Sequence, residues 1–526
     1  MIRPGWRVAI GAALLLVGLA GCTGKADPSP PPAVEEPQRG GTLRLGIVRP
    51  ASLDPARATS IHELLIADQL FDSLTSYAAT TAEPRPSLAA SWTASADLTM
   101  WEFRLRPGAT FVNGRAITAT DVKYSLDRVA APATRSSVAD LLEAITGFGA
   151  VASGAAVELS GVSVEAPDVV RIGLDRPLTT LPSLLGSPAL AVVPREAVEA
   201  SSVPFAERPV GSGPFRLLSR DPQRLLLGAA DPSRAYVDDV EVALFDSDGA
   251  SYDAFTRGSL DWSSVPPDRT TSVDGREVVR PYAGELFYGF NLRNPKYADV
   301  RFREAIVRAV SRDAIARRIY SGALRARTGF VVEGVPGYVA DPCGERCRND
   351  QARSRALLAE AFPDGRFPEV VLDHEDERTQ IAVAAAIQTD LQAVGLSVTT
   401  RATSAAAYSA LLASGQQEVF RLGWIAPYPT ADAFLGPLFE STSASNLTGL
   451  RSPAVDASLA AGRAAADPAA RVEHFRAAER AVLDAVPVVP IGHFETRAAL
   501  GSRVRGLDVT VMGTFDATAV WLVAAR

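Results

Sequence analysis

Thirteen consecutive apolar residues, Val8 to Ala20, follow two arginines at the start of this 526-residue chain. A helix needs about 20 apolar residues to span a bilayer, so this segment is too short for a stable membrane span. Arginines followed by a short apolar core are typical of a secretory signal peptide. We therefore predict that residues 1–21 direct export and that the protein folds outside the cytoplasm.

The apolar core ends at Leu19-Ala20-Gly21-Cys22, which resembles the lipobox of bacterial lipoproteins. The resemblance implies that Cys22 carries a lipid and anchors the chain to the outer face of the cell membrane. The alternative is an ordinary signal peptide followed by a chance cysteine. Residues 22–38 contain five prolines. Because proline-rich segments favour extended conformations, we expect a tether between lipid and fold.

Composition bounds what the rest of the chain does. A single hydrophobic core stops growing near roughly 250–300 residues, so this chain should form at least two lobes. Its 47% hydrophobic and 21% charged residues are typical of a globular protein. The net charge is −7 and no block of basic residues is present. We therefore expect no nucleic-acid partner.

Hydrophobic periodicity predicts mixed α/β structure. We expect strands over 41–48 and Met100–Leu105, then a helix capped by Thr118 or Thr120. Residues 300–319 carry an apolar stripe at helical spacing. Further along, helix 378–394, strand 396–401, helix 405–413 and strand 418–424 alternate as parallel α/β units do.

Two further cysteines, Cys343 and Cys347, lie in the segment DPCGERC. Export would place them in an oxidising compartment, where we expect a disulfide; free thiols are the alternative. No cluster of histidines lies nearby to complete a metal site.

Catalytic signatures are mostly missing. The four histidines form no HExxH, and the chain has no GxSxG, no P-loop and no Ser-x-x-Lys before its lysines. His374 lies in the acidic run DHEDER, which is interpreted as a solvated face, with a metal site as the alternative. We expect no enzyme activity, no metal and no cofactor, although a triad assembled across the fold would leave no local motif.

Several segments together resemble the extracellular solute-binding proteins of family 5, the oligopeptide, dipeptide and nickel receptors of ABC importers. They are GGTLRLGI…SLDPA, PSLAASWTASADLTMWEFRLRPGATFVNGRAITATDVKYSLDR, VGSGPFRL, RPYAGELFYGFNLRNPKYADVRFREAIVRAVSRDAI and FRLGWIAPYPTADAFL. They occur in family order and cover nearly the whole chain from Arg39 onward. The missing P-loop agrees with the resemblance, because the ATPase of such importers is a separate protein.

The resemblance implies a two-lobed periplasmic-binding-protein-like α/β fold, of type II and the large form, with the ligand enclosed between the lobes. Lobe I would take residues 39–283 and 488–526, including an extra subdomain at about 79–195. Lobe II would take residues 284–487. The lobes would close by a hinge motion around a ligand, and a permease would recognise the closed form.

The resemblance also implies which residues meet the ligand. Two segments would lay their backbones against it, as in strand addition generally. Trp424 and Tyr428 would offer wide faces with a polar tip; the alternative is that Trp424 is core and Tyr428 is rim. The full set of expected ligand-binding residues is Thr59, Ser60, Ile61, Asn291, Trp424, Ile425, Ala426, Pro427, Tyr428 and Asp432.

One departure limits the substrate. Peptide-binding relatives carry an aspartate shortly after the tryptophan, where it pairs with the α-ammonium of the peptide. Pro427 occupies that position here, and Asp432 lies five residues further on. Because a buried ammonium without a counter-charge is costly, peptides with a free N-terminus are disfavoured. A blocked peptide, a less charged solute or a metal chelate fits better.

We therefore expect a monomeric, lipid-anchored, extracytoplasmic substrate-binding protein of an ABC importer. It would capture a peptide or peptide-like solute and deliver it to a permease that works with a separate ATPase. The alternatives are a receptor for a non-peptide solute or metal chelate, and a lipid-anchored hydrolase or a sensor on the same fold.

Overall fold

The computed structural model describes residues 36–200, 203–267, 269 and 277–524. The predicted signal peptide, Cys22 and most of the tether lie outside these residues, so their roles stay predictions. Residues Gln38–Arg526 form one compact unit. No helix among the described residues is long and apolar enough to cross a membrane.

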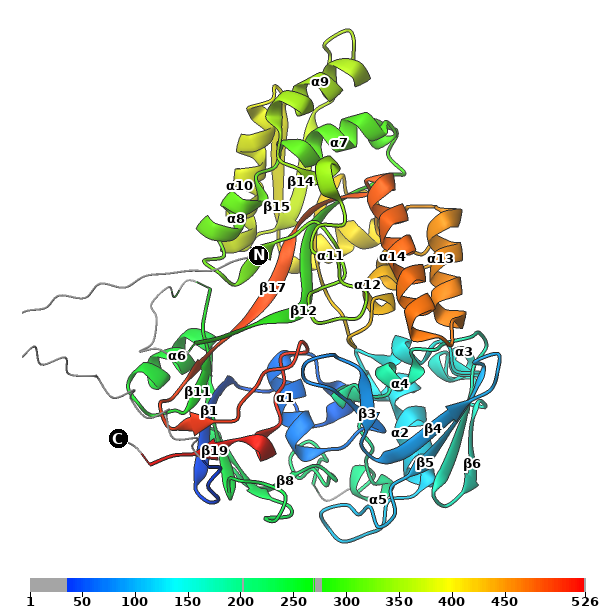
Figure 1. Ribbon diagram of the computed structural model, residues 1–526, viewed down its shortest axis with the longest axis vertical. Coiled ribbons are helices and arrows are strands. Elements are labelled where there is room, and N and C mark those ends of the chain that lie inside the picture. Colours follow the sequence, from blue (N-terminus) through cyan, green and yellow to red (C-terminus); the bar gives the residue numbers. More distant parts are fainter. Residues whose placement is uncertain (1–35, 201–202, 268, 270–276, 525–526) are drawn as a thin grey trace, which may run out of the picture. The chain divides into compact units, whose positions relative to one another are not determined.

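One large mixed sheet organises the compact unit. Figure 1 shows its two longest strands, β12 and β17, side by side and antiparallel through the middle of the sheet. On either side of this pair the sheet continues into parallel and antiparallel strands. Its order is β15 (Val398–Thr403), β14 (Val370–Glu375), β16 (Val419–Ile425), β12 (Glu277–Phe290), β17 (Val488–Leu500), β11 (Trp262–Ser264), β1 (Thr42–Val48), β10 (Asp239–Phe245), β9 (Arg224–Ala229) and β8 (Phe215–Arg220), with β13 (Leu324–Ala326) paired to β17.

Smaller sheets lie outside this path. A four-stranded antiparallel sheet falls within the predicted subdomain, and two strand pairs complete the strand set. These strands are β4 (Ala89–Ala94), β5 (Met100–Leu105), β7 (Val169–Gly173) and β6 (Val162–Ala166), then β2 (Thr75–Tyr77) with β3 (Pro84–Pro86), and β18 (Val504–Arg505) with β19 (Trp521–Leu522).

Helices pack on the sheets and on one another. They are α1 (Ile61–Leu70), α2 (Ala119–Ala130), α3 (Phe148–Ala152), α4 (Leu181–Leu184), α5 (Arg195–Val198), α6 (Asp248–Thr256), α7 (Val300–Ala309), α8 (Arg312–Arg318), α9 (Gln351–Ala361), α10 (Arg378–Gln392), α11 (Ala405–Ser414), α12 (Asp432–Phe439), α13 (Pro453–Ala464) and α14 (Pro468–Ala485). The mixed α/β class is therefore confirmed.

Local sequence explains where several elements begin. Thr118 is the N-cap of α2, and its backbone N–H donates to the Asp121 carboxylate at 2.9 Å, as in a capping box. The predicted strand Met100–Leu105 is confirmed as β5, and the alternating segments after residue 378 are confirmed as α10, β15, α11 and β16 within about two residues.

The stripe over residues 300–319 is one feature that the structure corrects. It forms two helices, α7 and α8, instead of one. Val310 takes an extended backbone conformation, and the Ser311 N–H donates to the Asp390 carboxylate at 2.7 Å. In a continuous helix the Ser311 N–H would donate to a backbone carbonyl one turn earlier. Here the Asp390 carboxylate takes that place, so α7 ends and α8 begins, although the apolar spacing continues across the break.

Candidate functional site

Strand β16 has one partly open edge. It pairs with β12 along its whole length, from Gly284 opposite Ile425 to Phe290 opposite Val419. On its other side, β14 pairs with Val419 and Phe420 only, and no described strand pairs with the edge of β16 over residues 421–425. An unpaired strand edge is a template for another extended chain.

The register shows which backbone groups this edge presents. Beyond the end of β16, the Ala426 N–H donates to the Ala283 carbonyl at 2.8 Å. Because antiparallel residues alternate in the direction of their hydrogen bonds, the N–H and C=O groups of Gly423 and Ile425 face away from β12. Arg421 lies two residues before Gly423, so its carbonyl also points away from β12. It accepts a hydrogen bond from the Tyr408 hydroxyl at 2.7 Å. Gly423 and Ile425 therefore offer two donors and two acceptors.

The side chains of β16 divide between the two faces of the sheet. Trp424 is partly buried, and its indole N–H donates to the Ala433 carbonyl at 2.8 Å. The tryptophan is thus fixed by the start of α12, while part of its surface stays accessible. Ile425 lies on the opposite face and is 57% exposed, an unusual value for a large apolar side chain in a central sheet.

Residues after β16 are buried more deeply. Ala426 is fully buried, Pro427 partly, and Tyr428 is 7% exposed. Burial raises the pKa of the Tyr428 hydroxyl, with a smaller contribution from Asp432. The Asp432 carboxylate accepts hydrogen bonds from the Arg463 guanidinium, so its charge is already paired within the protein.

Asn291 is likewise occupied by protein contacts. Its side-chain amide donates to the carbonyls of Gly415 and Gln417 at 3.0 and 2.8 Å, and its oxygen accepts from the Arg293 N–H. These bonds hold the turn before β16. The ligand contact of Asn291 stays a prediction.

The segment Thr59–Ile61 leads into α1. Glu63 accepts hydrogen bonds from the N–H groups of Thr59 and Ser60, at 2.7 and 3.0 Å, in a capping box. These two donors are therefore used within the protein. The Ile61 side chain is partly exposed and lies against Gly513, where the Tyr282 ring also approaches.

A loop near the C-terminus connects this segment to β16. The Ala283 N–H donates to the Val511 carbonyl at 2.7 Å, while the Ala283 carbonyl accepts from Ala426. Ile61 therefore contacts the Val511–Gly513 loop directly, and Ala426 is linked to the same loop through Ala283. The structure thus brings the two predicted segments into one neighbourhood, together with Tyr282 and Gly513, which sequence reasoning missed. No local pattern marks those two residues, because only long-range packing places them here.

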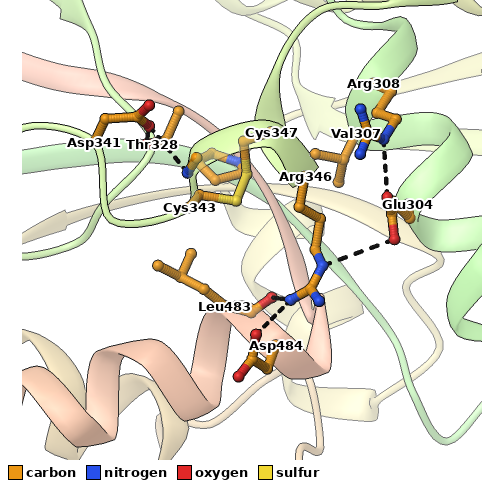
Figure 2. Close-up of a disulfide and its surroundings, with 12 residues drawn as sticks. Glu304, Val307, Arg308, Thr328, Asp341, Cys343, Arg346, Cys347, Leu483 and Asp484 are labelled. Atoms are coloured by element: carbon orange, nitrogen blue, oxygen red, sulfur yellow. Dashed lines mark hydrogen bonds and ion pairs between the residues drawn. A yellow bond between two sulfur atoms is a disulfide. The ribbon is translucent and has the colours of Figure 1, made fainter. Parts of the chain in front are cut away.

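Cys343 and Cys347 form a disulfide, with their Cα atoms 5.6 Å apart (Figure 2). Between them, Arg346 reaches Asp484 of α14 at 2.6 Å and Glu304 of α7 at 3.7 Å. The loop therefore joins two helices that are far apart in sequence, which indicates a structural role.

The interpretation of the acidic run around His374 as a solvated face is wrong for Asp373 and His374, which are buried and make structural contacts. Asp373 is fully buried, pairs with Arg401 and accepts the Glu418 N–H at 2.7 Å, and His374 Nδ1 lies 2.9 Å from the Glu375 carbonyl. The described residues contain no group of three His, Cys, Asp or Glu side chains arranged to hold a metal ion.

Comparison with known proteins identifies the family. Residues 83–446 match the model of the bacterial extracellular solute-binding proteins, family 5. The periplasmic murein peptide-binding protein MppA of Escherichia coli K12 is 25% identical over 486 residues, 88% of this chain and 89% of its own. The probable deoxycholate-binding periplasmic protein YgiS of the same organism is 25% identical over 469 residues, 84% of this chain and 86% of its own.

A solved structure agrees on the fold. The unliganded open form of the murein tripeptide-binding protein MppA superimposes with a TM-score of 0.81 at 23% identity, covering 92% of this chain and 98% of that one. The two-lobed fold of the periplasmic peptide-binding proteins is therefore confirmed, while the predicted lobe boundaries stay a prediction. The proteins of this family bind solutes and are not enzymes. The chain belongs to the bacterial extracellular solute-binding proteins of family 5.

Proposed function

We propose that this protein is the substrate-binding component of an ABC importer and captures an extended, peptide-like solute on the open edge of β16. The observation that carries the proposal is the outward direction of the Gly423 and Ile425 backbone groups. An extended ligand that pairs there adds one strand to the sheet. Main-chain hydrogen bonds then supply affinity for many sequences.

The proposed lobes, residues 39–283 with 488–526 and residues 284–487, close over this ligand. Ile61 and Tyr282 both approach Gly513, and Trp424 and Ile425 lie on the strand that pairs with β12. Only contacts that improve in the closed state drive closure. A permease with its own ATPase then receives the ligand from the closed form.

The ligand we propose has no free N-terminal ammonium at this edge. Pro427 supplies neither charge nor backbone donor, and the carboxylate of Asp432 is paired with Arg463. A peptide whose N-terminus is blocked by an acyl group can form hydrogen bonds with the backbone groups of this edge and needs no counter-charge. A non-peptide apolar solute is a second candidate, since Ile425 is 57% exposed and one relative is named a probable deoxycholate-binding protein.

We further propose that Cys22 carries a lipid and that the protein works as a monomer at the outer face of the membrane. Replacement Cys22→Ser is expected to move the protein from the membrane fraction to the soluble fraction. The uncleaved or soluble variant should also lack the added acyl mass. An unchanged membrane fraction would contradict the anchor without touching the binding site.

Native mass spectrometry of the chain, purified gently from its host, tests the ligand class. A retained ligand appears as a discrete added mass, which is identified after denaturation. A blocked or extended peptide supports the proposal, and a sterol-like or other apolar mass supports the second candidate. A mass without ligand, together with no uptake defect after gene deletion, would refute an importer role.

A further inference from the structure

A group of polar side chains lies at the carboxyl ends of the parallel strands β14 and β15, beside the first half of β16. Glu375 and Thr403 end the first two strands and are paired in register, and Arg421 lies on β16. Three more side chains come from β12, from the residues after α8 and from the first turn of α10. We call the set Tyr288, Tyr320, Glu375, Gln380, Thr403 and Arg421 the Arg421 cluster.

Contacts and electrostatics place these side chains together. The Arg421 Nη1 lies 3.2 Å from the Glu375 Oε1, and Tyr288 stands opposite Arg421 in the β12–β16 register. Arg421 lowers the pKa values of both Tyr288 and Tyr320 against the larger effect of burial, and a contact with the Gln380 side chain also acts to lower that of Tyr320. In open α/β sheets, the carboxyl ends of parallel strands are where ligands bind.

Every member of the cluster has one buried polar atom without a hydrogen-bond partner among the described residues. These atoms are Tyr288 Oη, Tyr320 Oη, Glu375 Oε2, Gln380 Oε1, Thr403 Oγ1 and Arg421 Nε. They are six of the thirteen such side-chain atoms in the described part of the chain, so nearly half gather at one place. Buried polar groups normally find partners, and a concentration of unsatisfied ones indicates a site that receives a polar group.

The cluster is neutral as a whole. Arg421 and Glu375 neutralise each other, and burial raises the pKa of the Tyr288 hydroxyl and raises that of Tyr320 to about 12, so both stay protonated. Two other acidic side chains nearby already have partners. Glu377 accepts hydrogen bonds as the N-cap of α10, and Asp373 forms an ion pair with Arg401. An anionic group would meet Glu375 and a cationic group would meet Arg421.

The unsatisfied atoms comprise both donors and acceptors. The Arg421 Nε–H donates, the Glu375 and Gln380 oxygens accept, and the tyrosine and threonine hydroxyls do either. A complementary group must therefore donate and accept while carrying no charge. A primary amide or a hydroxyl has this pattern.

The cluster lies next to the proposed ligand edge. Arg421, Gly423 and Ile425 share one face of β16, and the Arg421 Nη2 lies 3.0 Å from where a Cβ on Gly423 would be. Alternate side chains of a strand paired with Gly423 and Ile425 would fall on this face. A side chain in that position approaches the cluster from the open edge.

We propose that the Arg421 cluster is a subsite for an uncharged hydrogen-bonding side chain of the ligand, such as the primary amide of glutamine. The inference rests on the proposed binding of a peptide-like ligand at β16. It assigns a substrate class to that site: peptides that carry a neutral polar residue are preferred over those with an acidic or aliphatic residue of similar size.

Isothermal titration calorimetry with three blocked peptide series tests the subsite. The probes are N-acetylated tripeptide amides of alanine in which glutamine, glutamate or leucine replaces each position in turn. We expect the best glutamine peptide to bind roughly tenfold or more tightly than its leucine and glutamate counterparts, because a site built to hydrogen-bond rejects groups that leave it unpaired.

Two variants and a control separate binding from folding. Tyr288→Phe and Tyr320→Phe remove buried hydroxyls that make no well-formed hydrogen bond within the described residues, so the Tm should be unchanged or higher while the glutamine preference falls. The control is Tyr297→Phe, whose hydroxyl donates to Glu418 at 2.9 Å in the same part of the sheet. It should lower the Tm and keep the preference.

The outcomes are distinguishable. Equal binding of all three series, a preference for glutamate, or a glutamine preference that survives both phenylalanine variants would overturn the subsite and leave peptide binding intact. Lower Tm values in Tyr288→Phe and Tyr320→Phe with unchanged affinity would mean that the cluster holds water only, which also overturns it. No binding of any probe would overturn both the subsite and the proposed peptide-like ligand.

Discussion

Asp432 and Arg463 form a buried ion pair that joins α12 to α13. The Arg463 Nε donates to both carboxylate oxygens of Asp432, at 2.9 and 3.1 Å, and both side chains are less than a tenth exposed. The guanidinium also pairs with Glu440 at 2.9 Å. The carboxylate that sequence reasoning assigned to the ligand is thus tied to the protein itself.

We expect Asp432→Asn to lower the free energy of unfolding by about 2–4 kcal/mol, because it leaves a buried guanidinium with one partner in place of two. Urea denaturation measures this loss. Glu440→Gln, at the more exposed end of the same network, is the control and should cost less. Unchanged stability with weakened ligand binding would instead place Asp432 at the ligand.

The second prediction concerns the backbone N–H of Ile425. Ile425→Pro removes an N–H that faces the open edge and does not pair with β12, so the sheet loses no hydrogen bond. Binding of blocked tripeptides should weaken about tenfold, the value of one lost hydrogen bond of roughly 1.4 kcal/mol. Ile425→Ala keeps the donor and is the matched control.

If both variants bind equally weakly, the Ile425 side chain and not its backbone makes the contact. If neither variant changes binding and both stay folded by circular dichroism, ligands do not pair with this edge at all.

Local sequence patterns predicted much of the fold. The alternation in Met100–Leu105 and the capping box at Thr118 act over a few residues, so periodicity and propensity were enough to place β5 and α2. The break between α7 and α8 was not predicted, because its cause is the carboxylate of Asp390, about eighty residues away. Apolar spacing alone cannot report such an acceptor.

The site was predicted only in outline. Resemblance to the family named the segments around Ile61 and Trp424, and the structure adds how they meet, through Gly513 and Tyr282. The Arg421 cluster left no pattern in the sequence, since its members come from separate strands and helices. What makes them notable is the absence of partners among the described residues, which only coordinates reveal.

The third prediction concerns the missing charge at position 427, where Pro427 lies. Pro427→Asp introduces a carboxylate at the position where the family resemblance implies one. Affinity for tri-alanine with a free N-terminus should rise about tenfold relative to its acetylated form, because the new carboxylate pairs with the ammonium. Pro427→Asn, of similar size and without charge, is the control. Equal effects of the two variants would show that the backbone of proline, and not the missing charge, limits binding.

His493 makes the stability of the protein depend on pH. It lies on β17 opposite Glu285, is 5% exposed, and its Nε2–H donates to the Gly329 carbonyl at 2.8 Å. Burial, with a smaller contribution from Arg327, lowers the pKa of this histidine to about 4, while the Gly329 carbonyl opposes the shift. Glu285, also buried, has its pKa raised, so it supplies no negative charge at acidic pH.

An unfolded histidine takes up a proton below about pH 6.5, whereas the folded one does so only below about pH 4. Between these values unfolding binds a proton, so the free energy of unfolding falls as the pH falls from 6.5 to 4, by on the order of 3 kcal/mol from this residue. His493→Gln keeps an N–H donor without the titration and should lose that part of the acid dependence. Urea denaturation at pH 7, 5 and 4 measures the difference, with His474→Gln, at a partly exposed position of α14, as the control. Identical pH profiles for wild type and His493→Gln would show that the buried imidazole is not what limits acid stability.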